Sequence, residues 1–203
     1  MLTLYHSPSS RSARVRWLLE ELGIAYRLET LSFADGSLQS PAYLAKNPLG
    51  KVPTLEEDGV VIYESGAIVE YLLERHGRGR LAPAPGSPER PAFLQWLHWS
   101  EATCMYPIGE IAQHAFMRPE AERIPALVDD AKKRLARILG VVEQELATRD
   151  TLLPSGFSAA DIMLGYGLQI AKLIGQLPPE LPRTNAYLAR LAARPAFQKA
   201  FAD

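Results

Sequence analysis

Seven of the fifteen residues between Gly77 and Pro91 are glycine or proline, where an average sequence has roughly one in eight. Such a stretch predicts a linker, because neither a long helix nor a central strand tolerates it. Short apolar runs alternate with helical patterns before it, and only helical patterns follow it. We therefore expect an α/β domain at residues 1–78, a linker at 79–90 and an all-helical domain at 91–203.

The chain begins with an apolar run, Leu2–Tyr5, that predicts a buried strand. A helical pattern follows over Ser12–Leu22, and Gly23 stands where a helix commonly ends. A second strand is predicted over Tyr26–Leu31. Because a strand, a helix and a strand are joined by short connections, the two strands are expected to be parallel with a right-handed crossover.

The rest of the first half predicts a hairpin and a closing helix. After a short helical piece at Pro41–Ala45, the apolar runs Val52–Leu55 and Val60–Tyr63 flank an Asp-Gly pair, which is typical of a hairpin turn. Glu64–His76 is helical in pattern, and Gly77 ends it. The expected order of elements is β-α-β-α-β-β-α.

The second half contains four helical patterns. They cover Pro91 to about His114, Pro119–Arg149, Ser158–Ile174 and Pro182–Arg194. A kink is expected near Pro125, because proline cannot donate the backbone hydrogen bond of a helix interior. Ser158 and Asp161 stand at the spacing of a capping box, with Phe157 and Ile162 as its hydrophobic staple.

Composition limits the classes of function. A hydrophobic content of 47%, a charged content of 22% and a net charge of -1 lack the basic excess of a nucleic-acid or membrane-surface protein. The apolar stretch Ile162–Ile174 contains polar residues and is shorter than the ~18 apolar residues of a membrane span. We expect no nucleic-acid partner, no membrane segment and, since no secretory leader opens the chain, a cytoplasmic location.

A single cysteine, Cys104, excludes an internal disulfide and a metal site built on paired thiolates. It stands in a helical stretch without an evident basic neighbour, so we expect a small buried apolar residue rather than a reactive thiol. The four histidines lack the spacing of metal ligands, and no metal is expected.

Two motifs make the sequence resemble a known family. Asn47–Pro53 followed by Tyr63–Leu72 is similar to the glutathione-binding segment of the cytosolic glutathione S-transferases in residue type and in spacing. Ser158–Asp161 is similar to the capping motif in the second domain of that family. The resemblance covers the whole chain. It implies an N-terminal thioredoxin-like domain followed by an all-helical C-terminal domain.

The resemblance also implies how glutathione is held. In this family the peptide bond before the residue that matches Pro53 is cis, which turns the Val52 backbone toward the cysteinyl backbone of glutathione. Glu64 and Ser65 open the next helix, whose N-terminus attracts an anion, here the γ-glutamyl carboxylate. Lys51 is the expected contact for the glycine end. The alternatives are that Ser65 only caps the helix and that Lys51 is an ordinary loop lysine.

The turn after the first strand is expected to ionise the glutathione thiol. Ser9 stands where the serine-type classes (theta, phi and zeta) carry their activating hydroxyl, when residues are counted back from Gly23; counting forward from Tyr5 favours Ser10. Tyr5 matches the activating tyrosine of the tyrosine-type classes. Ser9 is our first choice, followed by Ser10 and Tyr5, with helix capping as the alternative role of the serines. The motifs leave the class open.

The implied function is conjugation of glutathione to an electrophilic apolar molecule. In this family the helix that contains Tyr106 walls the co-substrate pocket, although packing in the core is the favoured alternative for Tyr106 itself. Two other functions stay open, namely glutathione-dependent reduction of disulfides or peroxides and a non-catalytic role as a protein-binding module. The resemblance further implies a homodimer and glutathione as co-substrate.

Overall fold

The computed structural model describes residues 1–202 and divides into two compact units. The first contains Met1–Ala82 and the residues from Ala193 onward, and the second contains Pro83–Ala192. The division at Ala82 falls inside the Gly- and Pro-rich stretch. The C-terminal residues pack with the first unit, whereas the sequence pattern groups them with the helical half.

The first unit is built on a four-stranded sheet with the strand order β2-β1-β3-β4. Strand β1 (Leu2–His6) pairs in parallel with β2 (Arg27–Thr30) and antiparallel with β3 (Thr54–Glu57). A hairpin joins β3 to the antiparallel edge strand β4 (Val60–Tyr63). Helix α1 (Ser12–Leu22) connects the parallel pair. This topology confirms the predicted thioredoxin-like arrangement.

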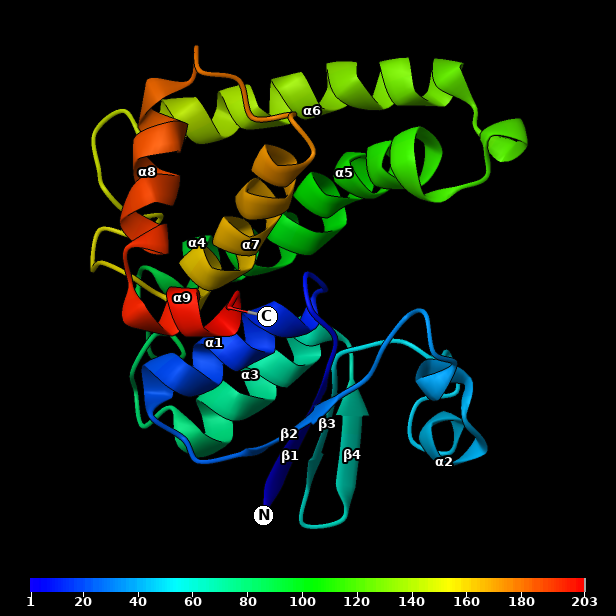
Figure 1. Ribbon diagram of the computed structural model, residues 1–203. Coiled ribbons are helices and arrows are strands. Elements are labelled where there is room, and N and C mark those ends of the chain that lie inside the picture. The colour runs from blue at the N-terminus through cyan, green and yellow to red at the C-terminus, as the bar shows by residue number, and fades with distance from the viewer. Residues whose placement is uncertain (203) are drawn as a thin grey trace. The chain divides into compact units, whose positions relative to one another are not determined.

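The two faces of the sheet are covered by different helices. Side chains alternate along β1, so that buried Leu4 and half-buried Tyr5 lie on opposite faces. Helices α1 and α3 (Ser65–His76) lie side by side on one face (Figure 1). On the other face Tyr5 packs against Tyr43 of the short helix α2 (Pro41–Leu44), with ring centroids 5.5 Å apart. A 3₁₀ turn at Ser37–Gln39 precedes α2.

The last helix, α9 (Pro195–Ala200), packs against α1 within the first unit (Figure 1). Trp17 of α1 meets Phe197 edge to face, with ring centroids 4.9 Å apart, and Phe197 stacks on Phe201 at 4.3 Å. Aromatic pairs in these arrangements stabilise a contact beyond the apolar area that they bury. The C-terminal segment is therefore part of the packing of the first unit.

The second unit starts with one long, irregular helix. Helix α4 (Arg90–Trp99) passes through a π-helical turn, Ser100–Cys104, into α5 (Met105–Ile111), and a second π-helical segment follows at Ala112–Met117. Pro107 explains the first π-helical turn. Its ring displaces the carbonyl group four residues earlier, and a π-turn removes that carbonyl from the regular ladder.

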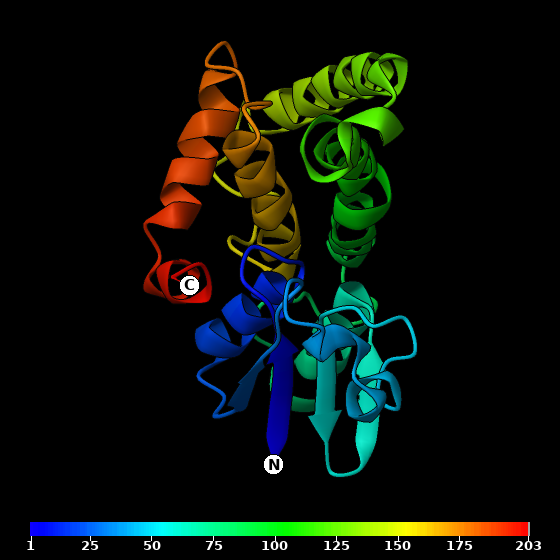
Figure 2. The same cartoon turned by 45° about the vertical axis from the view of Figure 1, so that its right-hand side comes forward.

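Helix α7 (Ala159–Leu173) forms the core of the second unit. It lies between α8 (Pro182–Ala192) and the helix made of α4 and α5 (Figure 2), and its first ten residues are all buried. Both halves of the predicted Ser158–Asp161 capping box are present. Cys104 is fully buried, which confirms the prediction for this residue. No helix within residues 1–202 has the length and apolar character to cross a membrane.

The predicted kinked helix over residues 119–149 is wrong. Helix α6 (Pro125–Glu145) begins at the proline, and a separate 3₁₀ turn, Glu120–Glu122, precedes it. Ile124 has extended angles, φ -119° and ψ 91°, as is usual for the residue before a proline. Proline is favoured at the first position of a helix, where its missing N–H group is not needed. Pro125 therefore starts the helix and does not bend it.

Candidate functional site

The strand register brings the predicted site residues to one end of the sheet. Thr54 pairs with Tyr63 across the hairpin, so that Pro53 and Glu64, the next residues outward, come to the same end. On its other side Thr54 pairs with Tyr5, so that the loop after β1 also leaves the sheet there. Three predicted segments therefore converge at this end, namely residues 7–11, 51–53 and 64–65.

Among these three segments, the one at residues 51–53 offers the backbone of Val52. The Val52–Pro53 peptide bond is cis, which confirms the expectation from the resemblance. The Val52 side chain is buried in a small cluster with Leu38 and Tyr43. Within residues 1–202, no hydrogen bond uses the N–H or the C=O of Val52. Both groups can therefore pair with the backbone of a bound peptide, as in strand addition.

A polar network holds the chain just before Val52. The Lys51 carbonyl oxygen accepts hydrogen bonds from the Tyr43 hydroxyl at 2.5 Å and from Asn47 Nδ2 at 2.8 Å. The same two groups lie 2.9 Å and 3.1 Å from Thr54 Oγ1. Asn47 and Thr54 are buried, where an unpaired polar group costs free energy. The network thus fixes this backbone segment, while the Lys51 side chain is exposed.

The second element is the N-terminus of α3. Glu64, the residue before the helix, has φ 77° and ψ 113°. A positive φ in a residue other than glycine is uncommon, and such strained residues cluster at functional sites. Ser65 is the first residue of the helix and is buried. The unpaired N–H groups and the positive dipole end of a helix favour an anion at such a position.

Arg14 of α1 contacts Ser65, and the sequence analysis did not identify it. Arg14 Nη1 donates a hydrogen bond to Ser65 Oγ at 3.1 Å, and the two side chains are 0% and 3% exposed. The sequence does indicate that Arg14 is buried, because this charged residue stands one helical turn before Leu18 on the apolar face of α1. An arginine is rarely fully buried unless it has a partner.

The third element is the serine-rich turn before α1. Ser10 Oγ donates to the Ser7 carbonyl oxygen at 2.7 Å and lies 2.6 Å from Ser12 Oγ, which lies 2.7 Å from Nδ1 of the buried His6. A serine hydroxyl has one proton. The Ser10 proton is therefore engaged within the turn. Ser9 is exposed and has a left-handed backbone, with φ 56°.

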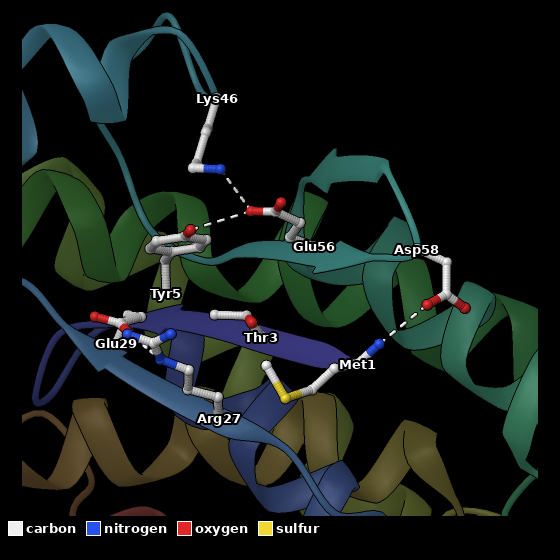
Figure 3. A pocket seen from close by; sticks show the side chains of 8 residues that line it. All are labelled: Met1, Thr3, Tyr5, Arg27, Glu29, Lys46, Glu56 and Asp58. Carbon is white, nitrogen blue, oxygen red and sulfur yellow. Dashed lines mark hydrogen bonds and ion pairs between the residues drawn. The ribbon is translucent and has the colours of Figure 1, made fainter.

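Tyr5 faces a different region, a polar cavity on the sheet face opposite α1 (Figure 3). Its hydroxyl donates to Glu56 Oε2 at 3.1 Å, and Lys46 Nζ binds the same oxygen at 2.5 Å. Burial and the carboxylate of Glu56 raise the pKa of Tyr5 above its ordinary value. The Tyr5 proton is thus directed to Glu56, whereas a residue that activates a thiol must direct its proton to sulfur.

Tyr106 of α5 is 61% exposed, so the expectation that it packs in the core is wrong. The guanidinium of Arg134 lies 5.5 Å from the centre of its ring, a cation–π contact on the surface of the second unit. The π-helical turn that ends at Cys104 directly precedes this part of the helix and sets the direction in which its side chains project.

The site combines backbone hydrogen-bonding groups, a helix N-terminus, a buried guanidinium and an exposed lysine. In the part of the chain that the structure describes, no three His, Cys, Asp or Glu side chains gather closely enough to hold a metal ion. Donors and positive charges of this kind suit an extended peptide that carries carboxylate groups.

The fold is that of a thioredoxin-like domain followed by an all-helical domain. Residues 1–74 match the glutathione S-transferase N-terminal domain family, and residues 125–190 match a glutathione S-transferase C-terminal domain family. The chain belongs to the glutathione S-transferase family.

Individual relatives agree with this assignment. The chain is 34% identical to glutathione S-transferase 4 of Zea mays over 197 residues, which cover 92% of this chain and 85% of that protein. It is 29% identical to the disulfide-bond oxidoreductase YfcG of Escherichia coli (strain K12) over 169 residues, covering 80% and 76%. The structure of the glutathione transferase URE2P6 of Phanerochaete chrysosporium, in complex with oxidized glutathione, matches with a TM-score of 0.88 at 28% identity, covering 99% and 94%.

Proposed function

We propose that this protein binds glutathione at the C-terminal end of β1, ionises its thiol and conjugates it to an electrophilic apolar molecule. The observation that carries the proposal is the convergence of the Val52 backbone, the N-terminus of α3 and the serine-rich turn at one end of the sheet. Related proteins named glutathione S-transferases, and a similar structure that contains oxidized glutathione, support it.

Each part of the tripeptide has a counterpart in the site. The N–H and C=O of Val52 pair with the cysteinyl backbone, with Pro53 directing them outward. Ser65 and the N–H groups at the start of α3 bind the γ-glutamyl carboxylate, and Glu64 sets the chain direction that presents them. The exposed ammonium of Lys51 binds the glycine carboxylate.

The thiol requires only modest help to ionise. With a pKa near ~8.5 it is a few per cent thiolate at neutral pH, and lowering this pKa by two units takes about 2.7 kcal/mol. A hydrogen bond to a charged group supplies ~1.5–3 kcal/mol, and a helix N-terminus supplies ~0.3–1 kcal/mol. One hydroxyl therefore suffices. We assign this role to Ser9, which stands at the position of the activating hydroxyl in the serine-type classes, whereas Ser10 and Tyr5 donate their protons to the Ser7 carbonyl and to Glu56.

A second reaction is reduction of disulfides. The glutathione thiolate attacks one sulfur of the disulfide and displaces the other as a thiolate, and a second glutathione thiolate then attacks the glutathione sulfur of the mixed disulfide, which releases the remaining thiolate and oxidized glutathione. The relationship to an Escherichia coli disulfide-bond oxidoreductase supports this alternative. It uses the same binding site and the same ionised thiol, but it takes a disulfide as the electrophile and consumes a second glutathione.

Calorimetric titration with reduced glutathione tests the binding, and parallel assays of an aromatic halide and of a small disulfide separate the two reactions. Ser65→Ala is expected to weaken binding by about 1–3 kcal/mol, the cost of removing a donor from a charged acceptor. Failure of the wild-type protein to bind glutathione would contradict both reactions. Unchanged affinity in Ser65→Ala would show that the Ser65 hydroxyl does not bind the ligand.

We further propose that the protein works in the cytoplasm as a homodimer, since the family pairs the first domain of one subunit with the helical domain of the other and closed two-fold assemblies are the commonest oligomers. Sedimentation at low micromolar concentration is expected to show twice the chain mass of 22.4 kDa. A particle of the single-chain mass would contradict the dimer.

A further inference from the structure

We infer that Arg14 is a positioning residue, which directs the Ser65 hydroxyl proton toward the γ-glutamyl carboxylate of glutathione. The inference rests on the proposed function and adds a residue to it. It starts from one contact between two buried side chains on neighbouring helices, in which Arg14 Nη1 lies 3.1 Å from Ser65 Oγ.

The chemistry of the two groups fixes the direction of this hydrogen bond. A guanidinium carries only donors and keeps its proton at any ordinary pH, so Arg14 donates and Ser65 accepts. A hydroxyl that accepts through a lone pair still has its own proton to donate. The neighbouring backbone groups at the start of α3 are themselves donors. The acceptor that completes this arrangement is an anion outside the helix.

Arg14 also places a permanent positive charge behind Ser65. The charge is fully buried, where solvent screens it less than it would a surface arginine. It adds to the positive end of the α3 dipole, and both favour a negative ligand. The arrangement therefore selects a carboxylate over a neutral amide at the γ-glutamyl position, whereas an arginine that only tied α1 to α3 would show no such preference.

Two ligands separate these roles: reduced glutathione, and an analogue in which the α-carboxylate of its γ-glutamyl residue is an amide. By calorimetry, the wild-type protein is expected to bind glutathione at least about tenfold more tightly than the amide. Arg14→Met is expected to lower the affinity for glutathione about tenfold and the affinity for the amide less than about twofold. Equal losses for both ligands, or no loss for glutathione, would overturn the inference.

A double variant tests whether Arg14 acts through Ser65. In a Ser65→Ala background, Arg14→Met is expected to reduce glutathione affinity by less than about a further twofold, because the group that it positions is already gone. If the double variant instead shows the sum of the losses in binding free energy of the two single variants, the inference would be overturned. Unchanged affinity in Ser65→Ala alone would instead overturn the proposed binding mode, whereas a weakened Ser65→Ala beside an unaffected Arg14→Met would overturn only the role of Arg14.

Arg16 provides the matched control, since it is a buried arginine of the same helix whose charge faces Glu20 and Tyr26. Arg16→Met is expected to leave the preference for the carboxylate unchanged. If Arg14→Met does not give a native circular dichroism spectrum, Arg14→Lys replaces it. Lysine keeps the charge but not the guanidinium geometry, and a loss of about threefold or more, confined to glutathione, is expected. Unchanged affinity for glutathione, or an equal loss of affinity for the two ligands, would overturn the inference.

Discussion

Arg194, the residue before α9, donates two hydrogen bonds to Glu21 of α1, from Nε to Oε1 at 2.6 Å and from Nη2 to Oε2 at 2.8 Å. Trp17 Nε1 donates to the same carboxylate at 2.9 Å. One turn along, Lys199 Nζ lies 2.9 Å from Glu20. A bidentate arginine–carboxylate pair is stronger and more specific than a single contact. These bonds therefore hold the C-terminal segment on the first unit.

Arg194→Gln is expected to lower the free energy of unfolding by about 1–2 kcal/mol, since it removes two charge-assisted hydrogen bonds from the half-buried Glu21. Urea denaturation followed by tryptophan fluorescence measures this loss. Arg190→Gln is the control, because its ion pair with Asp150 is exposed and is expected to contribute less than about 0.5 kcal/mol. Equal losses in the two variants would contradict a special role for Arg194.

The same pair makes stability depend on pH. Burial raises the pKa of Glu21, but the hydrogen bonds from Arg194 and Trp17 outweigh it, so the pKa lies below its ordinary value of 4.5. As pH falls, Glu21 is therefore protonated in the unfolded chain before it is protonated in the folded protein. The stabilisation that the Glu21 carboxylate provides is lost as the pH falls to the pKa of Glu21 in the folded state. The stability difference between wild type and Glu21→Gln is expected to be constant near neutral pH and to shrink below about pH 4.5. A difference that persists undiminished at about pH 3 would be evidence against this linkage.

The position of α9 shows what the sequence pattern could not reveal. The β3–β4 hairpin was predictable because its Asp58-Gly59 turn and the apolar runs beside it are neighbours in sequence, and the parallel pair followed from the short connections around α1. Glu21 and Arg194 are separated by 173 positions. A charged residue on an amphipathic helix gives no sign of its partner, so the docking of α9 on α1 had no local signal.

The residues of the candidate site that belong to sequence motifs were predictable, whereas the roles that depend on the orientation of a side chain in the folded protein were not. Residues 51–53 and 64–65 were identified from the resemblance, and the strand register brings them together. Ser9 and Ser10 look alike in sequence, but only Ser9 has a left-handed backbone, while Ser10 turns its hydroxyl inward to Ser7. Arg14 was missed because its partner Ser65 lies on a helix 51 residues further along the chain.

Ser158→Ala is expected to cost about 0.5–2 kcal/mol of stability and to leave glutathione affinity unchanged. Ser158 donates to Asp161 Oδ2 at 2.9 Å, and the same buried carboxylate also accepts from Leu152 N and the Tyr187 hydroxyl. Burial raises the pKa of Asp161, so each lost donor removes needed stabilisation of its charge. Thermal unfolding measures the stability and titration with glutathione measures the affinity, with Ser155→Ala as the control at an exposed serine. Lost affinity without lost stability would contradict a purely structural role.

Asn47→Ala is expected to destabilise the protein by about 1–3 kcal/mol and to weaken glutathione binding, because the Lys51 carbonyl and Thr54 Oγ1 each lose a buried donor. Tyr43→Phe removes the other hydrogen bonds of the network and is expected to act in the same direction. Urea unfolding and calorimetry provide both values. If both variants bind glutathione as the wild type does, the network does not position the backbone of Val52.

Ser9→Ala is expected to raise the thiol pKa of bound glutathione by more than a unit, because one pKa unit corresponds to ~1.36 kcal/mol and a charge-assisted hydrogen bond exceeds that. The thiolate absorbance of the complex, titrated against pH, measures this shift. Affinity is expected to change little, since in the proposed binding mode the tripeptide is held mainly by Val52, Glu64 and Ser65. The conjugation rate is expected to fall at neutral pH and to recover as pH approaches the free thiol value of ~8.5.

Ser10→Ala and Tyr5→Phe are the comparisons that decide this assignment. Ser10 donates to the Ser7 carbonyl at 2.7 Å and Tyr5 to Glu56 at 3.1 Å, so neither substitution removes a proton that points to the thiol. Both variants are expected to titrate within about 0.3 units of the wild type, although Ser10→Ala can lower stability by loosening the turn. If Ser9→Ala titrates like the wild type while one of the other two shifts the thiol pKa, the activating hydroxyl belongs to that residue.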